Sequence, residues 1–97
     1  MKYQEIVNGH SLVLVDFYAD WCGPCKMMVP VFNQLKKTMG HKLKIVKIDT
    51  ENNQKLSASM GIRSIPTMVL YKNGEKVWQQ PGAIPIHQLE QKIETFL

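Results

Sequence analysis

Both cysteines of the chain lie in one short segment, Trp21-Cys22-Gly23-Pro24-Cys25-Lys26, which connects two stretches of different hydrophobic pattern. Residues 12–15 before it form an apolar, β-branched run, which predicts a buried strand. Residues 27–39 after it repeat apolar side chains at helical spacing, which predicts a helix. A C-x-x-C pair between a strand and a helix is typical of a redox motif.

The expected position of the pair supports redox chemistry. Cys22 falls where the helix would begin, so unpaired backbone N–H groups and the positive end of the helix dipole would stabilise its thiolate. Pro24 suits the first helical turn, because its missing N–H would have no helical partner there. Cys25 is then one turn away, close enough to form a disulfide with Cys22.

Three other interpretations of the pair compete with the redox one. Half of a zinc site would need a second ligand pair, yet no other cysteine exists, and His10, His41 and His87 do not have metal-ligand spacing. A structural staple closing so short a ring would gain only about 2 kcal/mol from loop closure. Two inert buried thiols are the third alternative. We favour redox chemistry and predict neither a metal nor another cofactor.

Length and charge limit the remaining possibilities. The 97 residues suffice for one domain with a single core, and the hydrophobic (44%) and charged (21%) fractions are ordinary for a soluble globular chain. The net charge of +4 comes from lysines spread along the chain, without a basic run. We therefore predict no nucleic-acid partner.

Neither the N-terminus nor the apolar run predicts membrane targeting. The first ten residues lack the apolar core of a secretory signal, and residues 12–15 are too few to span a bilayer. We therefore expect a cytoplasmic protein with no membrane partner. In the cytosol a lone cysteine pair is more often catalytic than structural.

The pattern of the whole chain predicts a short helix followed by the order β-α-β-α-β-β-α. Strands are predicted at residues 12–18, 43–49, 67–71 and 76–79, and helices at residues 2–8, 23–38, 54–60 and from about residue 85. Asn73-Gly74 is a hairpin signal between the last two strands. The methionines of the 23–38 helix are expected in the core. The fold class is α/β, with a mixed sheet covered by helices on both faces.

Asp16 is the one charged residue in the first predicted strand. A carboxylate inside an apolar strand is costly unless it is protonated, paired or functional. Burial would raise its pKa, which suits a general acid or base that takes the proton from Cys25. The alternative is an aspartate at a solvated end of the strand.

Two segments resemble landmarks of the thioredoxin family. Val15-Asp16-Phe17-Tyr18-Ala19-Asp20-Trp21-Cys22-Gly23-Pro24-Cys25-Lys26 is similar to its active-site signature, and Ile62-Arg63-Ser64-Ile65-Pro66-Thr67 to its cis-proline segment. Lys72-Asn73-Gly74-Glu75 and Gly82-Ala83 also fall at the family's usual spacing. The resemblance covers about residue 11 to the C-terminus. It implies a thioredoxin fold of about four strands in a single domain, residues 1–97.

The resemblance also implies what the cysteines do. Cys22 would attack a protein disulfide and Cys25 would resolve the mixed disulfide, leaving a redox disulfide between them. Cys22 would face solvent, and Cys25 would be shielded. Gly23-Pro24 favours the reducing direction, because oxidants and isomerases of the family usually carry a histidine there. A disulfide oxidant or isomerase, and a docking module without turnover, are the alternatives.

The family's other site residues map onto this chain by motif. Lys47 would be the partner of Asp16, and Gly23, Pro24 and a cis Pro66 would support the site. A substrate-binding surface is implied at Trp21, Ile65, Pro66, Gly82 and Ala83. The implied partners are proteins with reducible disulfides and a thioredoxin reductase, in electron transport and cell redox homeostasis, with the chain as a monomer.

The sequence departs from the family at two places. The N-terminus is too short for the family's first strand, so residues 43–49 would form an exposed edge beside Lys42, Lys44 and Lys47. Pro81 stands where the family usually has a valine, which removes one N–H donor beside Gly82.

Overall fold

The computed structural model describes residues 2–97, and its element order matches the predicted one. The helices are α1 (Tyr3–Val7), α2 (Gly23–Met39), α3 (Gln54–Ser59) and α4 (Ile86–Glu94), with the 3-10 helix η1 (Gly40–Lys42) after α2. The strands are β1 (Leu12–Tyr18), β2 (Lys44–Asp49), β3 (Thr67–Lys72) and β4 (Glu75–Pro81). All predicted elements are therefore confirmed, with boundaries shifted by a few residues.

The four strands form one mixed sheet in the order β2-β1-β3-β4. β1 pairs in parallel with β2 and antiparallel with β3, and β3 pairs antiparallel with β4. β1 is therefore an inner strand, which explains why its residues from Leu12 to Phe17 are all buried. β2 is an outer strand, as expected from the sequence.

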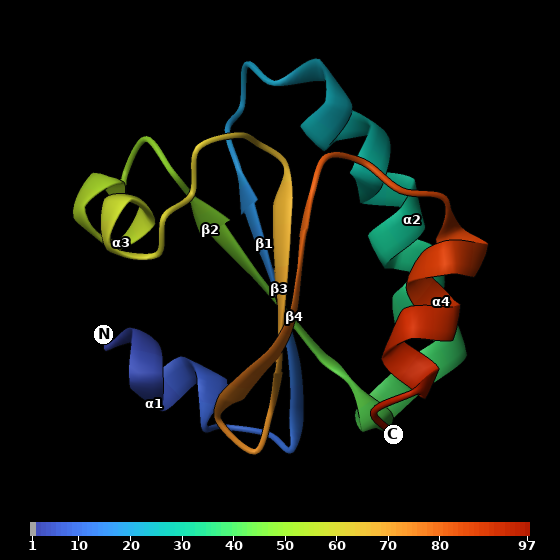
Figure 1. Ribbon diagram of the computed structural model, residues 1–97. Helices are drawn as coiled ribbons and strands as arrows, with labels where there is room; N and C mark the ends of the chain where they lie inside the picture. The colour runs from blue at the N-terminus through green and yellow to red at the C-terminus, as the bar shows by residue number, and fades with distance from the viewer. Residues whose placement is uncertain (1) are drawn as a thin grey trace.

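Helices cover both faces of the sheet, and each covered face has its own apolar cluster. Figure 1 shows α1 and α3 on one side of the sheet and α2 and α4 on the other. The cluster beneath α2 and α4 includes Leu14, Phe32, Leu35, Leu70, Leu89 and Ile93. The cluster beneath α1 and α3 includes Val7, Val13, Val15, Phe17, Ile48 and Val69. The predicted fold class is confirmed.

α2 carries the strongest helical pattern, and the structure corrects one expectation about it. Met28 and Met39 are buried in the core, but Met27 is 70% exposed. The buried stripe of α2 advances by three or four residues from Cys25 through Met28. Met27 lies one position before Met28 and therefore off that stripe.

The β3–β4 hairpin turns at Asn73 and Gly74, both of which have positive φ (51° and 83°). Such angles fit the tight Asn-Gly turn that the sequence predicts. The Asn73 N–H donates to the Ser11 carbonyl at 2.8 Å, so the turn is tied to the segment before β1. A Cβ on Gly74 would collide with Oδ1 of Asn8.

Gly74→Ala is expected to lower the free energy of unfolding by roughly 2 kcal/mol. Alanine at this φ costs about 1–2 kcal/mol, and Asn8 must also rotate away from the new methyl group. Urea melts at neutral pH measure the loss. Gly61→Ala is the matched control, because Gly61 also has positive φ but open space at its Cβ. If the two variants lose equal stability, contact with Asn8 contributes nothing.

No helix within residues 2–97 is both long and apolar enough to cross a membrane.

Candidate active site

Cys22 occupies the N-cap of α2, as the sequence predicts. Its backbone is extended, and its sulfur accepts a hydrogen bond from the Cys25 N–H at 3.2 Å. Pro24 lies in the first turn of the helix. The sulfur of Cys22 therefore sits among helix N–H groups, in the field that favours a thiolate.

The two cysteines form a disulfide with a Cα–Cα separation of 5.2 Å. We expected Cys22 to face solvent and Cys25 to be shielded, but their exposed fractions are 4% and 5%. Cys25 is shielded as expected, but the expectation that Cys22 faces solvent is wrong for this oxidised state, because Ala19, Tyr18 and Ile65 pack in one cluster with both cysteines. The cysteines differ instead in what they border.

Cys25 borders a cavity, open to solvent, that Asp16 also lines. The cavity has a volume of about 180 Å³ and is lined by Asp16, Tyr18, Ala19, Asp20, Cys25, Lys26, Val29 and Lys47. Cys22 does not line it. Asp16 and Cys25 therefore share one pocket, which has room for a water molecule.

Asp16 is only 3% exposed, which excludes the alternative of a solvated strand end. Its Oδ1 is buried without a hydrogen-bond partner among the residues that the structure describes. Burial raises the pKa of Asp16 to about 6, and the charge of Lys47 opposes this rise in part. The carboxyl group thus titrates near neutral pH, where it can both accept and return a proton.

Lys47 lies opposite Asp16 in the parallel register of β1 and β2. Its side chain is exposed, and its Nζ lies 5.7 Å from the ring centroid of Phe32. The charge of Lys47 lowers the pKa of Asp16, although less than burial raises it.

The structure brings three of the predicted substrate-binding residues, Ile65, Pro66 and Gly82, together beside Cys22. The Ile65–Pro66 peptide bond is cis, as predicted. The Ile65 carbonyl oxygen lies 3.6 Å from the sulfur of Cys22. The Gly82 N–H donates to the Pro66 carbonyl at 2.7 Å, which joins the end of β4 to the cis-proline loop. Ala83 follows and is exposed.

Pro81 is the last residue of β4 and pairs with Thr67. Its exposed ring provides no N–H to a partner beyond β4. Gly82 uses its own N–H internally, so this side of the surface presents few backbone donors.

Trp21 stands beside the disulfide with 68% of its surface exposed. Its Nε1–H donates to Glu51 Oε1 at 2.9 Å. A cavity of about 210 Å³ separates Trp21 from the loop that contains Arg63, Ser64 and Ile65. The sequence analysis missed Glu51, although a signal existed. Parallel strands end at the same edge of a sheet, so residues after β2 must lie near residues after β1.

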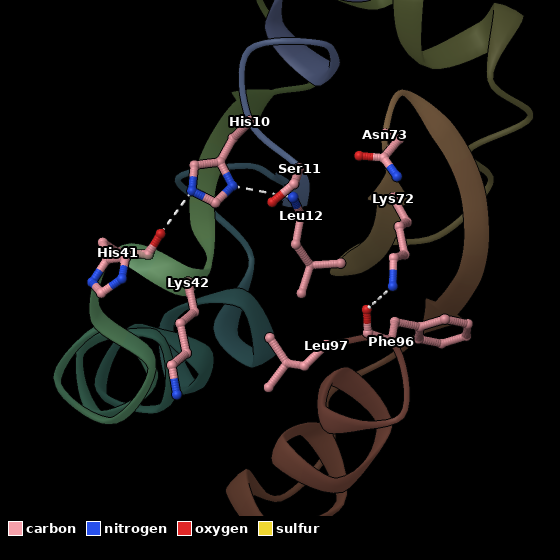
Figure 2. A pocket seen from close by; sticks show the side chains of 9 residues that line it. All are labelled: His10, Ser11, Leu12, His41, Lys42, Lys72, Asn73, Phe96 and Leu97. Carbon is pink, nitrogen blue, oxygen red and sulfur yellow. Dashed lines mark hydrogen bonds between the residues drawn. The ribbon is translucent and has the colours of Figure 1, made fainter.

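A larger cavity, of about 560 Å³, lies at the opposite end of β1 and is lined by none of the predicted site residues. Figure 2 shows the hydrogen bonds among the residues that line it. The Leu12 N–H donates to Nδ1 of His10 at 3.1 Å, and Nε2–H of His10 donates to the His41 carbonyl at 2.7 Å. Lys72 donates to the Phe96 carbonyl at 2.6 Å. These contacts join the ends of β1 and β3 to η1 and to the segment after α4, and we assign the cavity a structural role.

Within residues 2–97, no three His, Cys, Asp or Glu side chains gather as ligands of a metal ion would.

Comparisons with known proteins agree with this geometry. The family model described as Thioredoxin matches residues 1–95. The thioredoxin of Haemophilus influenzae is 49% identical over 95% of this chain and 86% of its own length. The chloroplastic thioredoxin Y1 of Arabidopsis thaliana is 44% identical over 95% of this chain and 54% of its own length. The solved structure of a mutant thioredoxin from Halobacterium salinarum superposes with a TM-score of 0.88 at 38% identity, covering 96% of this chain and 80% of its own.

Proposed function

The chain belongs to the thioredoxin family, and we propose that Cys22 attacks and Cys25 resolves when it reduces a protein disulfide. The observation that carries this assignment is the asymmetry around the disulfide. Cys22 caps α2 beside the Trp21 surface, whereas Cys25 borders the cavity of Asp16. Attack and resolution need these two different surroundings.

The exchange balances over two steps. In the first, the Cys22 thiolate forms a bond to one substrate sulfur while the substrate S–S bond breaks, and the departing thiolate takes a proton. In the second, Cys25 loses its proton and attacks the sulfur of Cys22. The Cys22–Cys25 disulfide forms, and the second substrate sulfur leaves. The substrate gains two electrons and two protons, and the protein is left oxidised.

Asp16 takes the proton of Cys25 in the second step of this proposal. Its carboxyl group shares a cavity with Cys25, and its pKa of about 6 makes it a base at neutral pH. Lys47 keeps that pKa from rising further. Asp16 as the base and Lys47 as the charge that limits its pKa therefore both assist the resolving step at Cys25, not the first attack by Cys22.

Substrates dock across Cys22 on the surface formed by Trp21, Gly23, Pro24, Ile65, Pro66, Gly82 and Ala83. An extended substrate segment pairs with the backbone of Ile65, in the manner of a short added strand. The nearness of the Ile65 carbonyl to the sulfur of Cys22 supports this placement.

We further propose that the chain works as one thioredoxin domain in the cytoplasm. Its substrates are proteins with reducible disulfides, and a thioredoxin reductase recycles it by returning two electrons to the Cys22–Cys25 disulfide. One cysteine pair without a bound cofactor suffices for this carrier role.

An insulin-reduction assay tests the proposed function. The chain is expected to accelerate precipitation of insulin chains with dithiothreitol, and also with NADPH and a bacterial thioredoxin reductase. A Cys22→Ser/Cys25→Ser double variant is the control and should show only the background rate. A wild-type chain that does no better than this variant would be a docking module instead.

Equilibration with glutathione buffers distinguishes a reductase from an oxidant. A reductase keeps its disulfide until the buffer is strongly reducing, whereas an oxidant loses it readily. Ready reduction of the Cys22–Cys25 disulfide by glutathione would contradict the reducing direction.

A further inference from the structure

The hydroxyl group of Thr67 holds the loop that passes beside Cys22. It donates to the Ser64 carbonyl at 2.6 Å. The next carbonyl along the chain, that of Ile65, lies 3.6 Å from the sulfur of Cys22. Figure 1 shows this loop entering β3 at the end of the sheet where α2 begins. Thr67 therefore holds the peptide group next to the one that borders Cys22.

Thr67 itself is fixed by the sheet. It is the first residue of β3, an inner strand, and it lies between Phe17 of β1 and Pro81 of β4. Only 2% of its surface is exposed. A β-branched side chain that is packed on all sides has few rotamers open to it. The direction of the hydroxyl is thus set by the strands and not by the loop.

The bond to Ser64 determines where the N–H of Ile65 points. The Ser64 carbonyl and the Ile65 N–H belong to one peptide group. That group is planar, and its C=O and N–H point in opposite directions. Because the buried Thr67 hydroxyl holds the carbonyl, the N–H of Ile65 is turned away from Thr67 and the buried end of β3.

The Ile65 N–H is the free backbone donor of this part of the surface. It has no hydrogen-bond partner within residues 2–97. Pro66 has no N–H, and the N–H of Gly82 is used by the Pro66 carbonyl at 2.7 Å. Of these three residues, only Ile65 can therefore donate a backbone hydrogen bond to an incoming chain.

We propose that Thr67 is a positioning residue for disulfide reduction, whose hydroxyl aims the Ile65 N–H at a backbone carbonyl of the substrate. This role rests on the proposed function, in which an extended substrate segment pairs with Ile65. The donor is oriented before the substrate arrives, so binding does not have to order the loop. Thr67 is buried and acts only through the Ser64–Ile65 peptide group.

Thr67→Val removes the hydroxyl and keeps the β-branched shape. Ser64 is exposed, so water can bond to its carbonyl in the variant, and the peptide group is then free to turn. The site should remain intact while its backbone donor loses its fixed direction. Thr67→Ser keeps the hydroxyl and should behave as wild type.

Two disulfides with the same leaving thiol separate positioning from general support of the site. One is a short extended peptide whose central cysteine is bonded to 2-mercaptoethanol, and the other is bis(2-hydroxyethyl) disulfide, which has no backbone carbonyl. Each is mixed with the reduced chain in a single turnover, without a reductase. Thr67→Val should reduce the peptide about fivefold more slowly than wild type, as expected for one lost hydrogen bond. It should reduce the small disulfide at the wild-type rate.

Thr95→Val is the matched control for this measurement. The Thr95 hydroxyl also donates to a carbonyl three positions earlier, that of Lys92, at 2.6 Å. It lies at the end of α4, and its loss should change neither rate. Equal slowing of both disulfides by Thr67→Val would overturn the proposal, because the hydroxyl would then support the site as a whole. An unchanged rate with the peptide would overturn it as well.

A binding measurement decides the role of Thr67 without turnover. The same peptide, with serine in place of its cysteine, is titrated into the Cys22→Ser/Cys25→Ser variant, and the NMR signal of the Ile65 amide is followed. That signal should shift on binding, and adding Thr67→Val should weaken the affinity several-fold. A signal that stays in place, or an affinity that Thr67→Val leaves unchanged, would contradict the proposal. A wild-type chain that reduces neither disulfide would refute the proposed function, and this titration would still decide whether Thr67 positions Ile65.

Discussion

The Cys25→Ser variant is expected to accumulate a covalent mixed disulfide with its substrate, whereas Cys22→Ser is expected to form none. In the proposed mechanism Cys22 meets the substrate first, because its sulfur lies beside Ile65 of the proposed substrate-binding surface. Without Cys25 the bond between Cys22 and substrate has no resolving thiol. Turnover should fall to background in both variants, so trapping alone separates the two roles.

Non-reducing gels and intact mass spectrometry with a disulfide-bonded protein substrate measure this difference. The adduct should disappear on adding dithiothreitol and should be absent from the double serine variant. If Cys22→Ser traps substrate through Cys25 instead, the assigned roles are reversed. Because both sulfurs are nearly buried in the oxidised state, the result also reports which one opens to substrate after reduction.

Asp16→Asn is expected to stabilise the fold at neutral pH and to slow disulfide reduction. The folded pKa of about 6 lies above the value of about 4 for an unfolded aspartate, so the native state binds more protons between these pH values. Stability then falls as pH rises from about 4 through about 6, by on the order of 3 kcal/mol at completion. A neutral amide removes this loss, although it also forgoes the attraction to Lys47.

Urea melts across pH are the measurement of stability. The increase in the free energy of unfolding caused by Asp16→Asn should be near zero at about pH 4 and largest at about pH 8. Glu75→Gln, at an exposed carboxylate of β4, is the control and should change stability little. An asparagine variant that is less stable than wild type at alkaline pH would contradict a destabilising buried charge.

Insulin-reduction rates give the functional half of the same prediction. The Asp16→Asn rate should be at least about tenfold lower at neutral pH, because Cys25 loses its base. The wild-type rate should rise through about pH 6, and the variant should lose that inflection. A variant with wild-type rate and pH profile would leave Asp16 with no part in resolution.

Much of the fold follows from local pattern. The uninterrupted apolar run of β1 predicts an inner strand, because only a strand covered on both faces can hide every side chain. Cys22 and Pro24 predict the start of α2, because a residue that can cap the helix and a proline in the first turn are both favoured only at a helix N-terminus. Asp16 could be singled out from the sequence because a carboxylate in an apolar strand is costly unless it is protonated, paired or functional.

What the sequence could not predict depends on contacts between distant segments. The near-equal burial of the two cysteines arises where Ile65 packs against them, 40 and more positions along the chain. Met27 is a different case, because the helical period that buries Cys25 and Met28 already places Met27 off the buried stripe, and the expectation that every methionine of the helix is buried overlooked this. The bond between Trp21 and Glu51 needs the parallel register of β1 and β2 before the two residues can be seen to meet.

The tether of Trp21 to Glu51 bears on how the substrate-binding surface proposed above would meet a protein partner. An exposed indole would ordinarily sample several rotamers and lose that freedom each time a partner bound. Here the ring is already oriented by its Nε1 hydrogen bond while two thirds of it faces solvent. Contact with the ring then carries little entropic cost, whatever the partner's side chains are. An indole ring that is already oriented in this way favours partners whose surfaces fit its shape, whatever their amino-acid sequence.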